Sequence, residues 1–200
     1  MNPDLSELVK KVDDQLTAHP NATLRIVAEK LVTTEDRIEE ALQNIEGLSF
    51  REYQDNKRLV QAFKQLGEFS PAADGPYELT RSRRRLMIPK TTVQYRQRRF
   101  WKRKSSYSDR CPLVDFSCEG LAFLADSALK AKDRLSLLLK FPDEDEAIRL
   151  DGCVVYAVAT GIAGYRYRIG IQYLPFAEKR GFNSTNTLDA LVRLEKTYSS

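Results

Sequence analysis

Short apolar segments, separated by residues that favour turns, fill the chain from about residue 92 to residue 174, and this pattern constrains the fold most. Alternating apolar side chains predict strands, and Gly161 and Gly164 mark a turn between the last two. The predicted strands lie within segments 92–95, 113–124, 133–139, 148–158 and 165–174. About six short strands at this spacing fit an antiparallel β-barrel.

Ahead of these strands, apolar residues recur every three or four positions, which predicts four helices. The first covers about residues 5–18 and is ended by Pro20, and Gly47 ends the third. Ser49 and Glu52 form a capping box that begins the fourth helix. The residues expected to face inward from the fourth helix are Phe50, Tyr53, Val60, Phe63 and Leu66.

These patterns predict an α+β protein with two domains. An all-α helix-turn-helix bundle is expected at residues 1–67, and a linker rich in proline and glycine at 68–80. A six-stranded antiparallel β-barrel with a C-terminal helix is expected at 81–200. That last helix is amphipathic around Leu191, so it either covers the barrel or pairs with a partner.

The segment Asp115–Gly120 carries a carboxylate, a hydroxyl and a glycine at the spacing D-x-S-x-x-G. Asp115 has the chemistry to accept the N–H donors of a guanine base, and Ser117 adds a hydroxyl. Gly120 has no Cβ, so the backbone can turn sharply there or a flat ligand can come close. The same residues also suit a β-turn with side-chain hydrogen bonds, so the motif alone does not identify a ligand site.

Upstream of this motif, Arg81 and Arg85 form the pattern R-x-x-x-R, with Arg83 and Arg84 between them. Guanidinium groups bind phosphate through paired donors, and the same fork fits the O6 and N7 acceptors of guanine. Residues 81–110 hold 12 basic side chains against one acidic residue, a net charge of +11, whereas residues 1–70 carry 9 basic and 13 acidic side chains, a net charge of −4. The charge therefore favours an anionic partner for the second domain and not for the first.

The two motifs, in this order and within a β pattern, resemble the PilZ domain, and the segment Tyr167–Tyr173 is similar to the last barrel strand of that family. The resemblance covers about residues 81–180. It implies a small β-barrel that binds the bacterial second messenger cyclic di-GMP (c-di-GMP). Many family members have a proline soon after the second arginine, whereas here the next proline is Pro89, so the loop after Arg85 is expected to follow a different path.

The resemblance also implies roles for single residues. Arg81 and Arg85 would clamp phosphate and guanine, Asp115 and Ser117 would bind guanine edges, and Gly120 would let the base approach. Arg83 and Arg84 would add positive charge without an assigned contact. We expect the ligand to order the arginine loop and to reorient the N-terminal helices. Whether a monomer or a dimer of the nucleotide binds stays open.

The helices before the linker have the helix, short turn, helix layout of a helix-turn-helix domain. Residues 47–62 resemble the end of an AraC-type helix-turn-helix and its linker helix, and the chain has room for one such unit. Val32 stands where the turn of many such motifs has glycine. The outer face of the expected recognition helix carries four acidic residues, Glu35, Asp36, Glu39 and Glu40, which would repel DNA phosphates. A protein partner is therefore favoured over DNA.

Residue types needed for catalysis or metal binding are scarce. The chain has one histidine, His19, and three scattered cysteines, so we expect no enzyme, no catalytic residue, no metal site and no cofactor besides the nucleotide ligand. No apolar run reaches the length of a membrane span, so we expect none. The odd number and scattered positions of the cysteines favour a reduced, cytoplasmic protein. The basic and aromatic residues at 96–104 suit a solvated strand edge or a nucleic-acid surface, and we favour the strand edge.

Two alternative functions stay open for the whole chain. One is a transcriptional regulator that binds DNA in response to c-di-GMP, which strongly salt-dependent binding to duplex DNA would identify. The other is an adaptor whose PilZ barrel binds no ligand, and the intact set of five motif residues argues against it.

Overall fold

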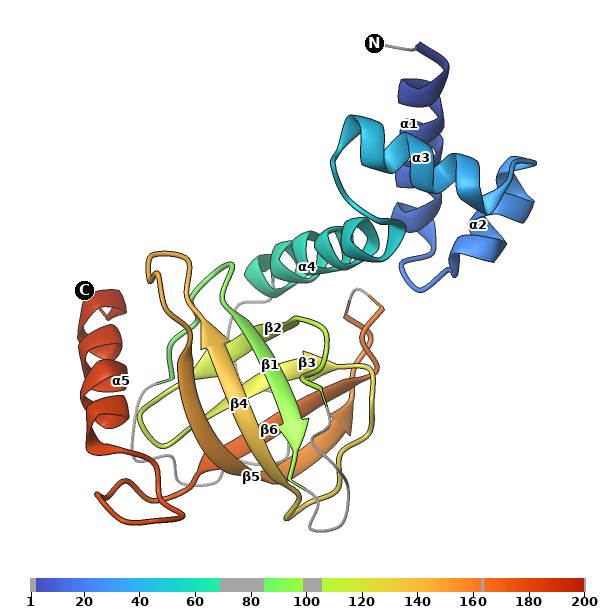
Figure 1. The fold of residues 1–200 in the computed structure, drawn as a ribbon. Helices are drawn as coiled ribbons and strands as arrows, with labels where there is room; N and C mark the ends of the chain where they lie inside the picture. The colour runs from blue at the N-terminus through green and yellow to red at the C-terminus, as the bar shows by residue number, and fades with distance from the viewer. Residues whose placement is uncertain (1–2, 69–84, 99–105, 163, 200) are drawn as a thin grey trace. The chain divides into compact units, whose positions relative to one another are not determined.

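The computed structural model of the 200-residue chain describes residues 3–68, 85–98, 106–162 and 164–199. The chain divides into two compact units, Met1–Ala62 and Phe63–Ser200 (Figure 1). The first is helical, and the second holds a β-barrel and a C-terminal helix, which confirms the predicted fold class. Most of the predicted linker at 68–80 lies outside the described residues.

Four helices build the first unit, and the last of them continues into the second. They are α1 (Pro3–Ala18), α2 (Leu24–Leu31), α3 (Glu35–Ile45) and α4 (Phe50–Glu68). The apolar faces of these helices meet in a single core, as their periodicity predicts. The buried residues of this core are Val9, Val12, Leu16, Ala22, Val27, Ala28, Ile38, Ala41, Leu42, Phe50 and Tyr53.

Side-chain caps fix where these helices begin. Thr34 Oγ1 accepts the Arg37 backbone N–H at 3.3 Å at the start of α3. The predicted capping box of α4 is confirmed, because the Ser49 N–H donates to Glu52 Oε2 at 3.0 Å and the Glu52 N–H donates to Ser49 Oγ at 3.4 Å.

The predicted inward face of α4 is wrong at Val60, whose side chain is 66% exposed. The buried positions in this part of the helix are Leu59, Ala62 and Leu66, and Phe63 is half-buried. Leu59 and Val60 are adjacent, so helical periodicity alone accepts either as the inward residue. Packing selects Leu59, one position away from the predicted register.

The turn between α2 and α3 contains a β-branched residue in the left-handed region. Val32 has φ 53° and ψ 49°, and its side chain is 93% exposed. Its N–H donates to the Glu29 carbonyl at 3.3 Å, and the Thr33 N–H donates to the Ala28 carbonyl at 3.1 Å. This is a helix end at which glycine is the usual residue, because a Cβ in the left-handed region crowds the backbone.

We expect Val32→Gly to stabilise the helical unit by about 1 kcal/mol, because it relieves this crowding and removes no buried contact. Chemical denaturation followed by circular dichroism measures the change. Val60→Gly is the matched control, since Val60 is also an exposed valine but lies inside α4, where glycine is expected to lower stability by about 0.5 kcal/mol. Equal losses in both variants would contradict the prediction.

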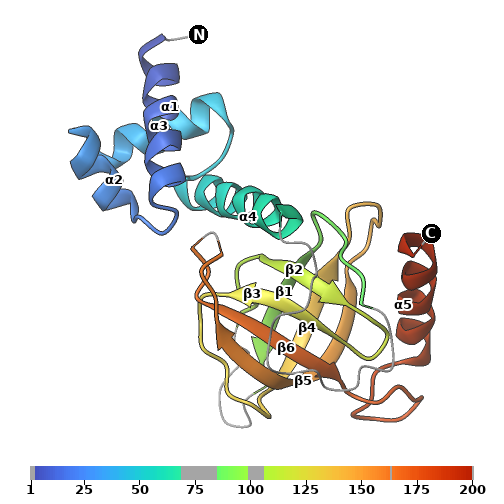
Figure 2. The same ribbon diagram turned by 180° about the vertical axis from the view of Figure 1, so that it is seen from behind.

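Six antiparallel strands close into a barrel in the order β1-β2-β3-β6-β5-β4 (Figures 1 and 2). The strands are β1 (Thr92–Gln97), β2 (Cys111–Phe116), β3 (Gly120–Ala125), β4 (Arg134–Lys140), β5 (Ile148–Ala159) and β6 (Tyr167–Tyr173). The view from behind in Figure 2 shows β3, β6 and β5 side by side, in agreement with their pairing. The predicted barrel is confirmed.

The C-terminal helix α5 (Thr185–Tyr198) packs against the barrel. Leu191 and Leu194 are buried in the same apolar core as Phe116 and Phe123 of the strands. Of the two alternatives drawn from its amphipathic sequence, the structure therefore places α5 on the barrel.

None of the described helices is both long enough and apolar enough to cross a bilayer. Within the same residues, no group of three or more histidine, cysteine, aspartate or glutamate side chains is arranged to hold a metal ion. The three cysteines, Cys111, Cys118 and Cys153, form no disulfide.

Candidate functional site

A β-bulge brings Asp115 to the outer side of the barrel wall. Leu113 and Phe116 both belong to the barrel core although they are three residues apart, which strict alternation along a strand does not allow. The pairing of β2 with β3 shifts register between Leu113 and Asp115, and the bulge accounts for the change. Asp115, next to the inward Phe116, therefore faces outward.

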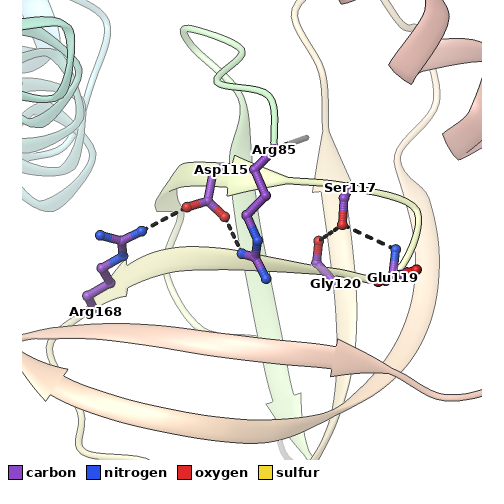
Figure 3. Close-up of polar contacts among 6 residues, drawn as sticks. All are labelled: Arg85, Asp115, Ser117, Glu119, Gly120 and Arg168. Carbon is purple, nitrogen blue, oxygen red and sulfur yellow. Dashed lines mark hydrogen bonds and ion pairs between the residues drawn. The ribbon is translucent and has the colours of Figure 1, made fainter. Parts of the chain in front are cut away.

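Two arginines hold the Asp115 carboxylate (Figure 3). Arg85 Nη1 pairs with Oδ1, and Arg168 Nη2 donates to Oδ2 at 2.8 Å. Asp115 is only 7% exposed. Since both carboxylate oxygens have a cationic donor, the buried charge of Asp115 is compensated.

The backbone explains how each arginine reaches Asp115. Leu86 and Phe116 exchange two backbone hydrogen bonds of 2.9 Å, which places the preceding Arg85 beside the end of β2. Arg168 lies in β6, opposite Leu124 of β3, and its neighbour Ile169 is buried in the core. Arg168 therefore faces outward, on the same side of the wall as Asp115.

The turn between β2 and β3 holds the remainder of the D-x-S-x-x-G motif. The Ser117 N–H donates to the Gly120 carbonyl at 2.8 Å. Ser117 Oγ accepts the Glu119 N–H at 3.3 Å (Figure 3). The Ser117 hydroxyl also donates to the Gly120 carbonyl at 3.4 Å. The structure thus contains the side-chain-bonded turn that the motif alone already suited.

Gly120 is required by close packing between strands. A Cβ built there would lie 2.2 Å from the carbonyl oxygen of Ile171 in β6. Gly120 pairs with Gln172, so the neighbouring backbone is held by the sheet. The fold itself therefore accounts for this glycine, and a role in admitting a base stays a prediction.

Two polar groups beside this site are buried. Among the described residues, neither Arg168 Nε nor the Tyr173 hydroxyl has a hydrogen-bond partner. Burial raises the pKa of Tyr173 well above its ordinary value, and the nearby charge of Arg85 acts in the opposite direction. Both groups can donate to an acceptor, but only Arg168 lies on the outward side of the wall with Asp115, since Tyr173 belongs to the barrel core.

The predicted site residues are only partly placed by the structure. It brings Arg85, Asp115, Ser117 and Gly120 to one end of β2 and β3, whereas Arg81, Arg83 and Arg84 lie outside the described residues. Sequence reasoning missed Arg168. The signal available for it was the single basic residue of the strand Tyr167–Tyr173, at an outward position.

The chain was compared with known families and structures. The family model for the PilZ domain matches residues 81–185, just over half of the chain. No curated protein gives a significant match. Nine chains of solved structures match, among them the Bacillus subtilis inhibitor of motility (MotI/DgrA), with 16% identity, a TM-score of 0.36 and coverage of 54% of this chain and 47% of that one.

A second match is a pathogenic protein from Xanthomonas campestris, described as a tetrameric PilZ domain self-assembled through a helical bundle. It is 18% identical, with a TM-score of 0.34 and coverage of 47% of this chain and 49% of that one. The chain thus spans about half the length of each of these two proteins. From the match to the family model, the chain belongs to the PilZ domain family.

Proposed function

We propose that this chain is a c-di-GMP receptor whose barrel binds the nucleotide around Asp115. PilZ proteins are c-di-GMP receptors and adaptors rather than enzymes. The observation that carries the proposal is the Asp115 carboxylate on the outer barrel wall, held by Arg85 of the first motif and by Arg168. These groups have the two chemistries that a guanine nucleotide requires, an acceptor for the base and cations for phosphate.

Binding would exchange the partners of these groups. Without ligand, the two arginines pair with the Asp115 carboxylate. The N1–H and N2–H donors of guanine would take over the carboxylate, and the phosphates would take over the arginines. Each of these groups keeps a hydrogen-bonding partner through the exchange, so none of them is left buried and unsatisfied.

Ser117 is a further contact in this proposal. Its hydroxyl donates to the Gly120 carbonyl and accepts from the Glu119 N–H, both through long bonds of 3.4 and 3.3 Å. A hydroxyl oxygen has two lone pairs, so Ser117 retains capacity to accept one donor from the guanine edge. Gly120, beside it in the turn, would leave room for the base.

The remaining arginines belong to the same proposal. Arg81 would bind the second phosphate or guanine, and Arg83 and Arg84 would add attraction for an anionic ligand. They follow the predicted linker at 68–80 directly, so ordering them around a nucleotide would reorient the helical unit relative to the barrel. That reorientation is the proposed output of the receptor.

A protein is the proposed partner of the helical unit. Glu35, Asp36 and Glu40 of α3 are exposed, and Arg37 on the same helix pairs with Asp4. This surface would repel the phosphates of DNA, so a DNA-binding regulator is the less favoured function, and a partner with a basic surface fits better.

Calorimetric titration of the 200-residue chain with c-di-GMP, beside GTP, tests the proposal. We expect selective binding of c-di-GMP, and we expect Arg85→Ala to weaken it by about tenfold or more, because a charge-assisted contact to phosphate is lost. Arg98→Ala is the matched control. Arg98 also pairs with a barrel aspartate, Asp151, at 2.6 Å, but lies outside both motifs, so its affinity should stay within about twofold of wild type. Absence of binding in folded wild-type protein would refute the receptor function.

A further inference from the structure

Helix α5 reaches into the D-x-S-x-x-G turn through one residue. Glu195 Oε1 accepts the backbone N–H of Cys118 at 3.0 Å, and Glu195 Oε2 accepts its thiol at 2.8 Å. Cys118 is 5% exposed and directly follows Ser117 in the turn. Both oxygens of the Glu195 carboxylate thus accept hydrogen bonds from Cys118 of the D-x-S-x-x-G motif.

Other contacts fix α5 independently of Glu195. Leu191 and Leu194 are buried in the barrel core, and the Tyr198 hydroxyl donates to Asp143 Oδ2 at 2.6 Å. Just before the helix, the buried Asn183 donates to the carbonyls of Asp151 and Leu174 at 2.9 and 2.8 Å. Glu195 therefore stands on a helix anchored at several points, and its position is well determined relative to the strands.

The Ser117–Gly120 turn is a segment that the hydrogen bonds to Glu195 would stabilise. Ser117 and Glu119 lie at the end of the strand pair away from Arg168 (Figure 3). The Ser117 hydroxyl is held by bonds of 3.3 and 3.4 Å, which are long for hydrogen bonds, so the hydroxyl is weakly fixed by its own turn. A side chain bonded to the next residue restricts the backbone that carries it.

On the basis of the proposed c-di-GMP site, we propose that Glu195 of α5 is a positioning residue that preorganises the Ser117–Gly120 turn for the nucleotide, and that nucleotide occupancy and the docking of α5 are thereby coupled. A preorganised turn binds a ligand without first losing conformational freedom, which raises affinity. Because coupling free energies are reciprocal, the nucleotide then holds α5 on the barrel more tightly by the same factor. A change in the docking of α5 would therefore change the affinity of the nucleotide site.

Three variants of the 200-residue chain test this inference by calorimetric titration with c-di-GMP. Glu195→Ala removes both hydrogen bonds to Cys118 and is expected to lower affinity by about tenfold. Glu195→Gln keeps an oxygen that can accept the Cys118 N–H and is expected to recover most of that loss. Tyr198→Phe removes a hydrogen bond of the same helix that does not reach the turn, and the buried Leu191 and Leu194 keep α5 docked, so its affinity should match wild type.

Hydrogen exchange gives a second measurement that a general packing defect would not reproduce. In wild type, c-di-GMP is expected to slow amide exchange in α5, and in Glu195→Ala this slowing should disappear while α5 stays helical. Wild-type affinity in Glu195→Ala, or an equal loss in Tyr198→Phe, would overturn the inference and leave the receptor function intact. If wild type itself fails to bind, the receptor function fails and the inference fails with it. Should Glu195→Ala not fold, rapid exchange of the Cys118 amide in wild type would alone overturn the inference.

Discussion

Replacing Gly120 by alanine is expected to destabilise the barrel by about 3 kcal/mol. The added Cβ would lie 2.2 Å from the Ile171 carbonyl oxygen and 3.2 Å from its carbonyl carbon. These atoms belong to backbone in β6, which pairs with both β3 and β5 and cannot shift without breaking a ladder. Thermal unfolding followed by circular dichroism should show a midpoint lower by roughly 10 °C.

Gly161→Ala provides the matched control for this prediction. A Cβ at Gly161, in the segment between β5 and β6, meets no atom within 4 Å. Stability should therefore change by less than about 0.5 kcal/mol. If Gly120→Ala were as stable as Gly161→Ala, the close approach of β3 and β6 at this point would be wrong.

The close packing at Gly120 changes how the glycine of the D-x-S-x-x-G motif is interpreted. The family resemblance explains Gly120 by the approach of the ligand, but the barrel needs this same glycine even without a ligand. Loss of nucleotide binding in Gly120→Ala would thus reflect a damaged fold. Arg85, Asp115 and Glu195 are better probes of the ligand, because their replacement leaves the strand pairing in place.

The barrel strands could be predicted from the sequence because the alternation of inward and outward side chains along a strand is a local signal. Leu121, Phe123 and Ala125 alternate into the core, and so do Leu135, Leu137 and Leu139. The local signal fails at the bulge before Asp115, where Leu113 and Phe116 both face inward. The outward position of Asp115 depends on pairing with β3, which a single strand does not reveal.

The contacts that complete the site are long-range, and sequence reasoning did not find them. Arg168 is 53 residues from Asp115, and Glu195 is 77 residues from Cys118. Each meets the motif because the barrel closes β3 onto β6 and α5 packs on the closed barrel. Motif spacing identified Arg85 and Asp115, since the family resemblance carries that pair, but it contains no information about β6 or α5.

Replacing Asp115 by asparagine is expected to lower c-di-GMP affinity by about 100-fold. The carboxylate can accept two donors from the guanine edge, and hydrogen bonds to a charged group contribute about 1.5–3 kcal/mol each. An amide of the same shape offers one acceptor and turns its NH₂ group toward the N–H donors of the base. The variant also leaves Arg85 and Arg168 without their shared anion, so phosphate attraction persists while recognition of the base is lost.

This difference makes selectivity the sharper measurement. Cyclic di-AMP has the same backbone, but adenine presents an acceptor at N1 where guanine presents a donor, so the Asp115 carboxylate should reject it. Titrations of both nucleotides should show that Asp115→Asn binds them with affinities closer to each other than wild type does. Asp151→Asn is the control, because Asp151 also holds an arginine, Arg98, and accepts from Ser136 Oγ at 2.7 Å on another part of the barrel. If Asp115→Asn weakened both nucleotides equally and kept the wild-type ratio, Asp115 would act through the charge balance of Arg85 and Arg168, and base recognition would have to be sought at Ser117 or among the arginines that precede Arg85.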